Sequence, residues 1–330
     1  MQKVLVIIDK WGWSYDTIAK GLVRYNQNPR LVFDVVSVTD DLDFIEQHHA
    51  RYDIVFALGW TLVISKKKHH HYREQLPFLD RQRLITGIHS HRSWDGYTST
   101  PDFAPPPPPE LLQQLSKLRG INIISRRLHS IFKDAGLTNI TLTENGVDTA
   151  LFTPTLPIST DRRYPLVIGF SGSKEITKHD ELKGFSEFIL PLSDAPNVRI
   201  QILGGRGEGQ VPRDEMPNLY NQIDLYICAS SSEGFSQSVL EASACGRGIL
   251  STRVGGCEDL IREGQNGFSF QRNLTDLQAL VKRLEADRPL VKRLGEANRQ
   301  ITEKYYSWNI KVKDWLRFIE SHLPVPHSIA

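Results

Sequence analysis

Two acidic residues eight positions apart form the most chemically suggestive pattern in the chain. Glu233 lies in the serine- and glycine-rich run 230–234, and Glu241 lies in the small-residue stretch that follows. At about 100° per residue the two carboxylates would differ by about 80° around a continuous helix, so both could face one ligand. Carboxylates accept hydrogen bonds from the hydroxyls of a sugar or a ribose. The alternative is that Glu233 only complements the dipole at a helix start and that Glu241 is a solvated helix residue. An unpaired charge at Glu241, between Leu240 and Ala242, would however be costly.

A strand followed by a helix must position this pair. The mostly apolar stretch 224–229 predicts a strand, and the pattern after the loop predicts a helix that begins near Ser236. This order places unpaired backbone N–H groups and the positive end of a helix dipole at the loop, where they suit a phosphate. The loop is therefore expected to bind an anion that carries hydroxyl groups.

Short apolar runs alternate with amphipathic stretches along the whole chain. Runs of this kind, each bounded by Gly, Pro, Asn or Ser, predict strands at 4–8, 31–38, 54–57, 84–88, 121–124, 138–143, 166–170, 198–203, 225–228, 248–251 and 267–270. Fully apolar strands separated by helices are typical of parallel sheets covered on both faces. The sequence predicts an α/β protein with two Rossmann-like domains that face each other across a cleft, with ligands at the carboxyl ends of the strands.

Proline and polar residues mark the expected boundary between the two domains. Prolines and a polar run interrupt the alternation between residues 145 and 165, so we expect a first domain at 1–155 and a second at 156–306. Residues 307–330 are expected to hold an amphipathic closing helix that could cross back onto the first domain. The five prolines 105–109 predict a stiff segment before a helix that starts near Glu110.

Composition excludes several classes of protein. The chain has 330 residues and a net charge of +2, from 40 basic and 38 acidic residues, so neither disorder nor nucleic-acid binding through global charge is indicated. No window approaches about 18 consecutive apolar residues. The spacing of Cys228, Cys245 and Cys257 matches no zinc or redox motif. We expect free thiols and a cytoplasmic protein, soluble or peripheral at the inner membrane face.

Several motifs in the second half combine into a family resemblance. The stretch from Glu233-Gly234-Phe235 to Glu241 and on to Gly246 resembles the Glu-x7-Glu element of the retaining glycosyltransferases of family four, also called glycosyl transferases group one, which have the GT-B architecture. The similarity continues at 254–261 and 266–268, and upstream at 144–154 and 182–184. Each motif alone is weak, but the combination is specific.

The resemblance implies a role for each matching residue. Glu233 would contact the transferred sugar, Glu241 the nucleotide ribose and Lys183 the diphosphate. The loop residues Gly234, Phe235 and Ser236 would line the donor site. A fixed ammonium and helix N–H groups would stabilise the departing nucleotide, so neither a metal nor another cofactor is expected.

The chain departs from the family pattern at the diphosphate. The family places an arginine after the glycine that corresponds to Gly172, but Ser173 and then Lys174 follow here. Lys174 or Arg206 could replace the missing cation, and Arg206 could equally be a solvated loop residue. Gly172, Ser173, Lys174 and Arg206 are therefore the remaining donor-site candidates in this half.

Three sets of residues in the first half could reach the same ligand. His89 follows a predicted strand and resembles the family histidine that approaches the donor sugar, with His91 as the competing choice and a strand-capping histidine as the alternative. The family usually has a glycine pair beside the donor phosphate and the acceptor, and Gly12 is the one glycine of that pair present in this sequence. Trp11 and Trp13 could stack on an acceptor sugar or simply pack.

A basic region extends from Lys66 to Arg92. Between residues 60 and 92 seven Lys and Arg residues face two acidic ones, which gives a local charge of +5. This region could contact anionic lipid headgroups or a phosphate-bearing acceptor, or be a solvated surface. The pair Asp41 and Asp43 resembles a metal-binding Asp-x-Asp only superficially, because it precedes a predicted helix.

The expected function is that of a metal-independent, retaining glycosyltransferase. It would move a sugar from a UDP- or GDP-sugar to a hydroxyl of a glycan, lipid-linked or small-molecule acceptor. Two alternatives remain: a nucleotide-sugar epimerase on the same scaffold, or a catalytically silent GT-B module that binds a glycan or a protein partner.

Overall fold

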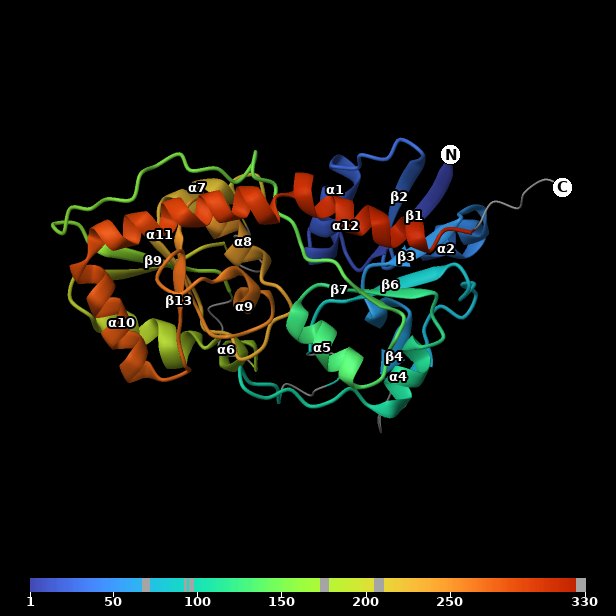
Figure 1. The fold of residues 1–330 in the computed structure, drawn as a ribbon, viewed down its shortest axis with the longest axis horizontal. Helices are drawn as coiled ribbons and strands as arrows, with labels where there is room; N and C mark the ends of the chain where they lie inside the picture. Colours follow the sequence, from blue (N-terminus) through green and yellow to red (C-terminus); the bar gives the residue numbers. More distant parts are fainter. Residues whose placement is uncertain (67–71, 92–93, 95–97, 173–177, 205–210, 325–330) are drawn as a thin grey trace. The chain divides into compact units, whose positions relative to one another are not determined.

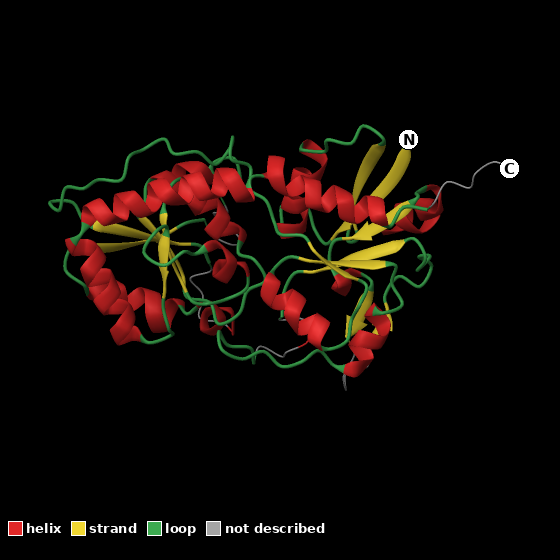
Figure 2. Ribbon diagram, in the orientation of Figure 1, coloured by secondary structure: helices red, strands yellow, loops and turns green. Residues whose placement is uncertain are grey.

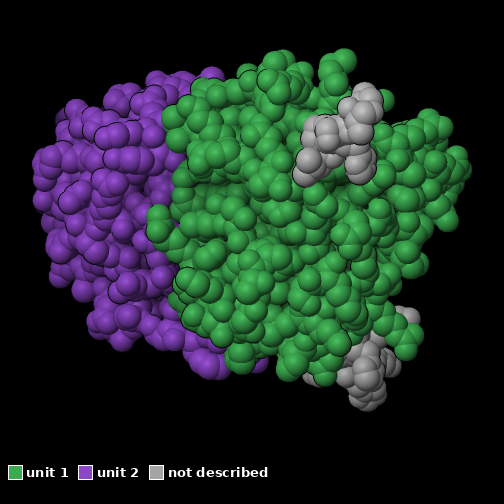
Figure 3. Space-filling view, turned by 45° about the vertical axis from the view of Figure 1, so that its right-hand side comes forward, with its two compact units in different colours: residues 1–96, 105–146, 308–330 green, residues 97–104, 147–307 purple. Residues whose placement is uncertain are grey.

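The chain folds into two compact α/β units, each with its own parallel sheet (Figures 1 and 2). The computed structural model describes residues 1–66, 72–91, 94, 98–172, 178–204 and 211–324. The first unit comprises Met1–Gly96, Pro105–Gly146 and Trp308–Ala330, and the second comprises Tyr97–Ala104 and Val147–Ser307. Figure 3 colours the two units separately. The chain thus enters the second unit's main segment at Val147 and returns to the first unit at Trp308.

The first unit contains a six-stranded sheet in the order β2-β1-β3-β6-β7-β8, with every neighbouring pair parallel. Its strands are β1 (Gln2–Ile8), β2 (Leu31–Ser37), β3 (Ile54–Ala57), β6 (Leu84–Ile88), β7 (Gly120–Ile123) and β8 (Ile140–Leu142). Its helices are α1 (Ser14–Arg24), α2 (Leu42–His48), α4 (Pro109–Leu115), α5 (Arg126–Asp134) and α12 (Trp308–Ser321), with 3₁₀ turns η1 (His49–Arg51) and η2 (Trp60–Leu62).

The closing helix α12 is fixed to the first unit by buried polar contacts. Lys311 forms an ion pair with Glu144, and Trp315 Nε1 donates to the Glu144 carbonyl oxygen at 3.0 Å. Gly21 on α1 lets Trp308 approach, because a Cβ there would lie 2.2 Å from the indole ring. Helices α1 and α12 therefore pack closely, as Figure 1 shows.

The second unit contains a five-stranded parallel sheet in the order β10-β9-β11-β12-β13. Its strands are β9 (Leu166–Phe170), β10 (Val198–Ile202), β11 (Leu225–Cys228), β12 (Gly248–Ser251) and β13 (Gly267–Ser269). Its helical elements are α6 (Lys178–Lys183), η4 (Phe185–Ile189), η5 (Leu190–Asp194), α7 (Met216–Asn221), α8 (Gln237–Ala244), α9 (Gly256–Leu260), α10 (Leu274–Ala286), α11 (Arg288–Ile301) and η6 (Thr302–Tyr306).

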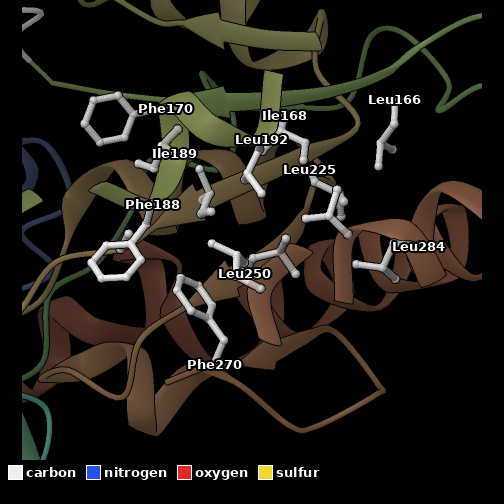
Figure 4. Close-up of a cluster of buried hydrophobic side chains, with 14 of the residues drawn as sticks. Leu166, Ile168, Phe170, Phe188, Ile189, Leu192, Leu225, Leu250, Phe270 and Leu284 are labelled. Atoms are coloured by element: carbon white, nitrogen blue, oxygen red, sulfur yellow. The ribbon is translucent and has the colours of Figure 1, made fainter. Parts of the chain in front are cut away.

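A buried apolar cluster holds the second unit's sheet against its helices. Ile168 and Leu225 from the sheet and Leu284 from α10 are fully buried in it (Figure 4). Burial of each such side chain contributes about 1.5–3 kcal/mol. This core makes the sheet a rigid support for the loops at its carboxyl edge.

The predicted fold class is confirmed. All eleven predicted strands are present, and both large sheets are parallel. An antiparallel hairpin of β4 (Ile64–Lys66) and β5 (Tyr72–Glu74) was not predicted from the sequence. Three-residue strands beside a run of lysine and histidine carry too little alternation to be recognised.

Candidate functional site

The loop between β11 and α8 carries the first candidate carboxylate. Strand β11 ends at Cys228, and α8 begins at Gln237 with Ser236 as its N-cap. Glu233 therefore lies in the loop, four residues before the helix. The predicted angle of about 80° between two carboxylates on one helix does not apply, because only Glu241 is helical.

Glu233 is held by a lysine and a serine. Lys183 Nζ forms an ion pair with Glu233 Oε1, and Ser230 Oγ donates to the same oxygen at 2.8 Å. The side chains of Lys183 and Glu233 are 28% and 12% exposed, so the pair is accessible without being fully solvated. The cluster thus combines a cation, a carboxylate and a hydroxyl within the second unit.

Backbone contacts bring Lys183 to this loop although it lies 50 residues away in the sequence. Ser231 N donates to the Leu182 carbonyl oxygen at 2.8 Å. The next residue, Gly184, has φ +66°, and a Cβ there would lie 2.9 Å from the Ala229 carbonyl oxygen. A side chain at Gly184 would therefore push the lysine segment away from the loop.

Glu241 lies on α8 and is 4% exposed. Tyr220 OH donates to Glu241 Oε2 at 2.9 Å, and Arg213 Nη1 lies 2.6 Å from Oε1. Burial, followed by the charge of Glu241, raises the pKa of Tyr220 well above its usual value, so this hydroxyl stays protonated and donates. The guanidinium of Arg213 also lies 5.1 Å from the centre of the Phe152 ring. Glu241 is therefore a buried, doubly contacted carboxylate rather than a solvated one.

The other donor-side candidates of the second unit divide into three groups. Gly234 O accepts from Gly256 N at 2.8 Å, and the buried ring of Phe235 lies 5.7 Å from that of Tyr306, so both hold the loop in place. Gly172 lies two residues beyond β9. Ser173, Lys174 and Arg206 lie outside the described residues.

His89 follows β6 at the carboxyl edge of the first unit's sheet. Its ring centre lies 5.1 Å from that of Tyr15 and 6.3 Å from that of Trp315. Burial lowers the pKa of His89 from 6.5 to about 3, so the imidazole is neutral at physiological pH. His91 instead stacks on Trp94 at 5.6 Å and is 2% exposed. The two histidines therefore have different aromatic neighbours.

The low pKa of His89 predicts a pH effect on stability. Between pH 6.5 and about 3 the unfolded chain binds a proton at this position and the folded chain does not, so stability falls as the pH falls through this range. We expect His89→Asn to flatten the acid limb of the stability profile, measured by denaturant unfolding at several pH values. His48→Asn on α2 is the control, and an unchanged slope in His89→Asn would contradict the assignment.

The loop after β1 presents two exposed tryptophans. Trp11 and Trp13 are 43% and 52% exposed, and Lys10 Nζ lies 5.6 Å from the centre of the Trp13 ring. Between them Gly12 has φ +79°, and its N–H donates to Asp16 Oδ2 at 2.9 Å. The Gly12 amide is thus engaged by Asp16.

The acidic pair near the first unit's second strand forms a helix start. Asp41 is the N-cap residue of α2, and its Oδ2 accepts from Ser37 N at 2.8 Å. The described residues contain no group of three His, Cys, Asp or Glu side chains that could hold a metal ion. All three cysteines are free and buried, as expected.

Comparison with known proteins identifies the second unit. Residues 208–301 match the sequence model of the family Glycosyl transferases group 1. The chain carries a group 1 glycosyl transferase domain. This segment includes Glu233, Glu241 and the whole loop that joins β11 to α8.

Curated relatives share this domain. An uncharacterized glycosyltransferase of Methanocaldococcus jannaschii is 31% identical over 101 residues, which are 30% of this chain and 28% of that protein. The sulfoquinovosyl transferase of Arabidopsis thaliana is 35% identical over 103 residues, which are 29% of this chain and 20% of that protein. The matches thus span less than a third of the length of these two relatives.

Solved structures share the fold over nearly the whole chain. HepE of Anabaena, crystallised with UDP and glucose, has a TM-score of 0.71 at 14% identity and covers 97% of this chain and 100% of its own. Sucrose-phosphate synthase of Thermosynechococcus elongatus has a TM-score of 0.71 at 13% identity, covering 97% of this chain and 99% of its own. The chain therefore has a GT-B fold, and the group 1 domain lies within its second unit.

Two residues that contact Glu241 were not predicted from the sequence. Arg213 and Tyr220 belong to no recognised motif and reach Glu241 from 28 and 21 positions away. Nothing in their sequence spacing signals these contacts, since they depend on how α7 and the residues just before it pack beside α8.

Proposed function

We propose that this chain is a retaining glycosyltransferase that moves a sugar from a nucleotide-diphosphate sugar to a hydroxyl acceptor. The observation that carries the proposal is the cluster of Lys183, Glu233 and Ser230 at the carboxyl end of β11. Ser230 and Glu233 lie inside the group 1 glycosyl transferase segment 208–301, and Lys183 precedes it in the sequence. In this role Lys183 binds the diphosphate, Glu233 the transferred sugar and Glu241 the ribose.

The proposed chemistry needs these groups because negative charge develops on the nucleotide. The bond from the anomeric carbon to the phosphate oxygen breaks, and its electron pair leaves with the nucleotide diphosphate. The acceptor oxygen bonds to the same face of the sugar, and its proton passes to a phosphate oxygen. A fixed ammonium at Lys183 stabilises the leaving phosphate, so we propose no metal or other cofactor. In the donor-free chain this ammonium pairs with Glu233.

The names of similar proteins support the classes of substrate that we propose. HepE has been crystallised with UDP-glucose, and a Campylobacter jejuni relative, 28% identical over 159 residues, is an N-acetylgalactosaminyltransferase named for a diphospho-undecaprenol substrate. We accordingly propose a UDP- or GDP-sugar as donor and a glycan, lipid-linked or small-molecule acceptor. His89 and Gly12 would approach the donor, and Trp11, Trp13 and His91 the acceptor.

A peripheral membrane contact would suit a lipid-linked acceptor. We propose that the basic region from Lys66 to Arg92 provides it, although residues 67–71, 92 and 93 lie outside the described part of the chain. Within that region Arg81 pairs with Glu74, and Arg83 lies 3.6 Å from Asp80. Every helix in the described part of the chain is too short or too polar for a membrane span. Binding to vesicles that contain anionic lipid, lost at high salt, tests the contact.

Two measurements test the proposed function. A thermal-shift panel of UDP, GDP and their sugars identifies the donor, because a ligand that binds the folded state raises the melting temperature. Incubation with the radiolabelled sugar, with and without acceptors, then identifies the reaction. Acceptor-dependent transfer supports the proposal. Isomerisation without acceptor would indicate an epimerase, and binding without either reaction would indicate a silent module.

Arg213 should compete with the ribose for Glu241. A ribose hydroxyl and the guanidinium would both bind Oε1, so we expect Arg213→Met to tighten UDP or GDP binding by up to about fivefold, measured by calorimetry. The limit corresponds to about 1 kcal/mol for a partly exposed ion pair. Arg283→Met is the control, because the guanidinium of Arg283, in the same unit, also lies over a ring, 4.5 Å from the centre of Phe268. Weaker nucleotide binding in Arg213→Met would instead mean that Arg213 contacts the nucleotide.

A further inference from the structure

Three polar atoms converge over Gly87 in the first unit's sheet. A Cβ at Gly87 would lie 2.4 Å from His89 Nε2, 2.5 Å from the Leu58 carbonyl oxygen and 2.6 Å from Asn122 Oδ1. Gly87 is paired in register with Asn122 on β7, and Leu58 directly follows β3, the other neighbour of β6. Residues 87 and 89 point to the same face, so the His89 ring folds back over the glycine. Three polar atoms thus surround the position that a side chain at residue 87 would occupy.

Two of these three atoms are buried without a hydrogen bond. His89 Nε2 and Asn122 Oδ1 have no partner among the residues that the structure describes, and Asn122 is fully buried. Leaving such groups unbonded costs about 1–3 kcal/mol each, so native proteins satisfy them with protein groups or ordered water. Asn122 Nδ2 donates to Thr143 Oγ1 at 2.9 Å, and Asn122 Oδ1 lies 2.6 Å from the Cβ position over Gly87. Its oxygen therefore faces the space over Gly87.

We propose that Asn122 and the Leu58 carbonyl hold His89 in its Nε2–H tautomer through one water molecule seated over Gly87. Both carbonyl oxygens can only accept, so the water must donate its two protons to them. The water can then bond to the histidine only by accepting from Nε2–H. In the other tautomer one of the three atoms would lose its bond to this water. Asn122 is thus a positioning residue for His89.

The tautomer decides what His89 can do. Burial keeps the ring neutral, since it lowers the pKa of His89 to about 3. With its proton on Nε2, the ring has only a lone pair at Nδ1 and can accept but not donate a hydrogen bond there. If the proposed function holds, His89 therefore acts on a substrate hydroxyl as an acceptor. The tautomer itself does not depend on that function.

Nitrogen NMR of the donor-free full-length protein tests the assignment. In protein labelled with ¹⁵N-histidine, a long-range ¹H–¹⁵N correlation at pH 7 distinguishes protonated from unprotonated ring nitrogens, and His89→Gln identifies the His89 signals among the 11 histidines. We expect a protonated-type shift at Nε2 and an unprotonated-type shift at Nδ1. The reverse pattern would overturn the proposal even if sugar transfer were demonstrated, and the expected pattern would stand even if it were not.

Variants at position 122 test the role of the asparagine. Asn122→Leu removes the acceptor, so the water can donate to Nε2 and the signals should move toward a mixture of tautomers. Asn122→Asp keeps an acceptor and should retain Nε2–H, with a higher pKa for His89. Asn139→Leu is the control, because Asn139 also has a buried, unbonded Oδ1 in the same unit. Unchanged Nε2–H signals in folded Asn122→Leu would refute the role, and if that variant does not fold, loss of Nε2–H in Asn122→Asp would refute it.

Discussion

Glu233→Gln and Lys183→Ala are each expected to lower kcat/KM for sugar transfer by on the order of 100-fold or more. Losing one preorganised charge at a transition state typically costs about 3–4 kcal/mol, which corresponds to this range. Lys183 is expected to act on the leaving diphosphate, so Lys183→Ala should also weaken UDP or GDP binding. Glu233→Gln should leave nucleotide affinity nearly unchanged, because its partner would be the sugar. Initial rates with labelled donor and calorimetry with the nucleotide measure the two effects.

Matched substitutions separate these effects from a general loss of structure. Glu187→Gln changes an exposed glutamate in the same unit whose ion pair with Arg272 measures 3.4 Å, and Lys282→Ala removes an exposed lysine on α10. Both should retain full activity. Normal transfer by a folded Glu233→Gln protein would exclude the proposed role, and equal loss of nucleotide binding in both site variants would mean that Glu233 serves mainly to hold Lys183.

The central strands were predictable because the fold buries them. Parallel strands covered on both faces are mostly apolar runs, and β3, β6, β7, β9, β11 and β12 are buried along their whole length. The hairpin of β4 and β5 has three residues per strand and carries no such run. Prediction from sequence therefore succeeds where burial alone determines the residue types.

The site was predictable only as far as its motifs reach. Glu233 and Lys183 were recognised as separate motif residues, but their ion pair depends on the backbone contact between Ser231 and Leu182. Asn122 did leave a signal that the sequence analysis did not use, since it is a polar residue inside the apolar run 121–124. A buried strand has no reason to hold an amide unless the amide bonds to something nearby.

Gly255→Ala is expected to combine a large loss of stability with a loss of transfer. Gly255 has φ +47° and ψ −132°, a sparsely populated backbone conformation that costs a residue with a side chain about 1–3 kcal/mol. In addition, a Cβ there would lie 2.1 Å from the Gly234 carbonyl oxygen and 2.4 Å from that of Glu233. Relief of this overlap must move the loop backbone, which adds about 1–3 kcal/mol and displaces the Glu233 carboxylate. Denaturant unfolding and the transfer assay measure the two losses.

Gly264→Ala provides the control that separates backbone strain from the overlap. Gly264 has φ +72° in the same unit, but the nearest atom to its Cβ position is Phe268 Cε1 at 3.8 Å. This variant should therefore lose about 1–2 kcal/mol from φ alone and keep its activity. The difference between the two glycines then measures how firmly the Gly255 backbone supports the loop. Equal destabilisation with equal activity would mean that the loop moves without cost, and Glu233 would then not depend on a preorganised position.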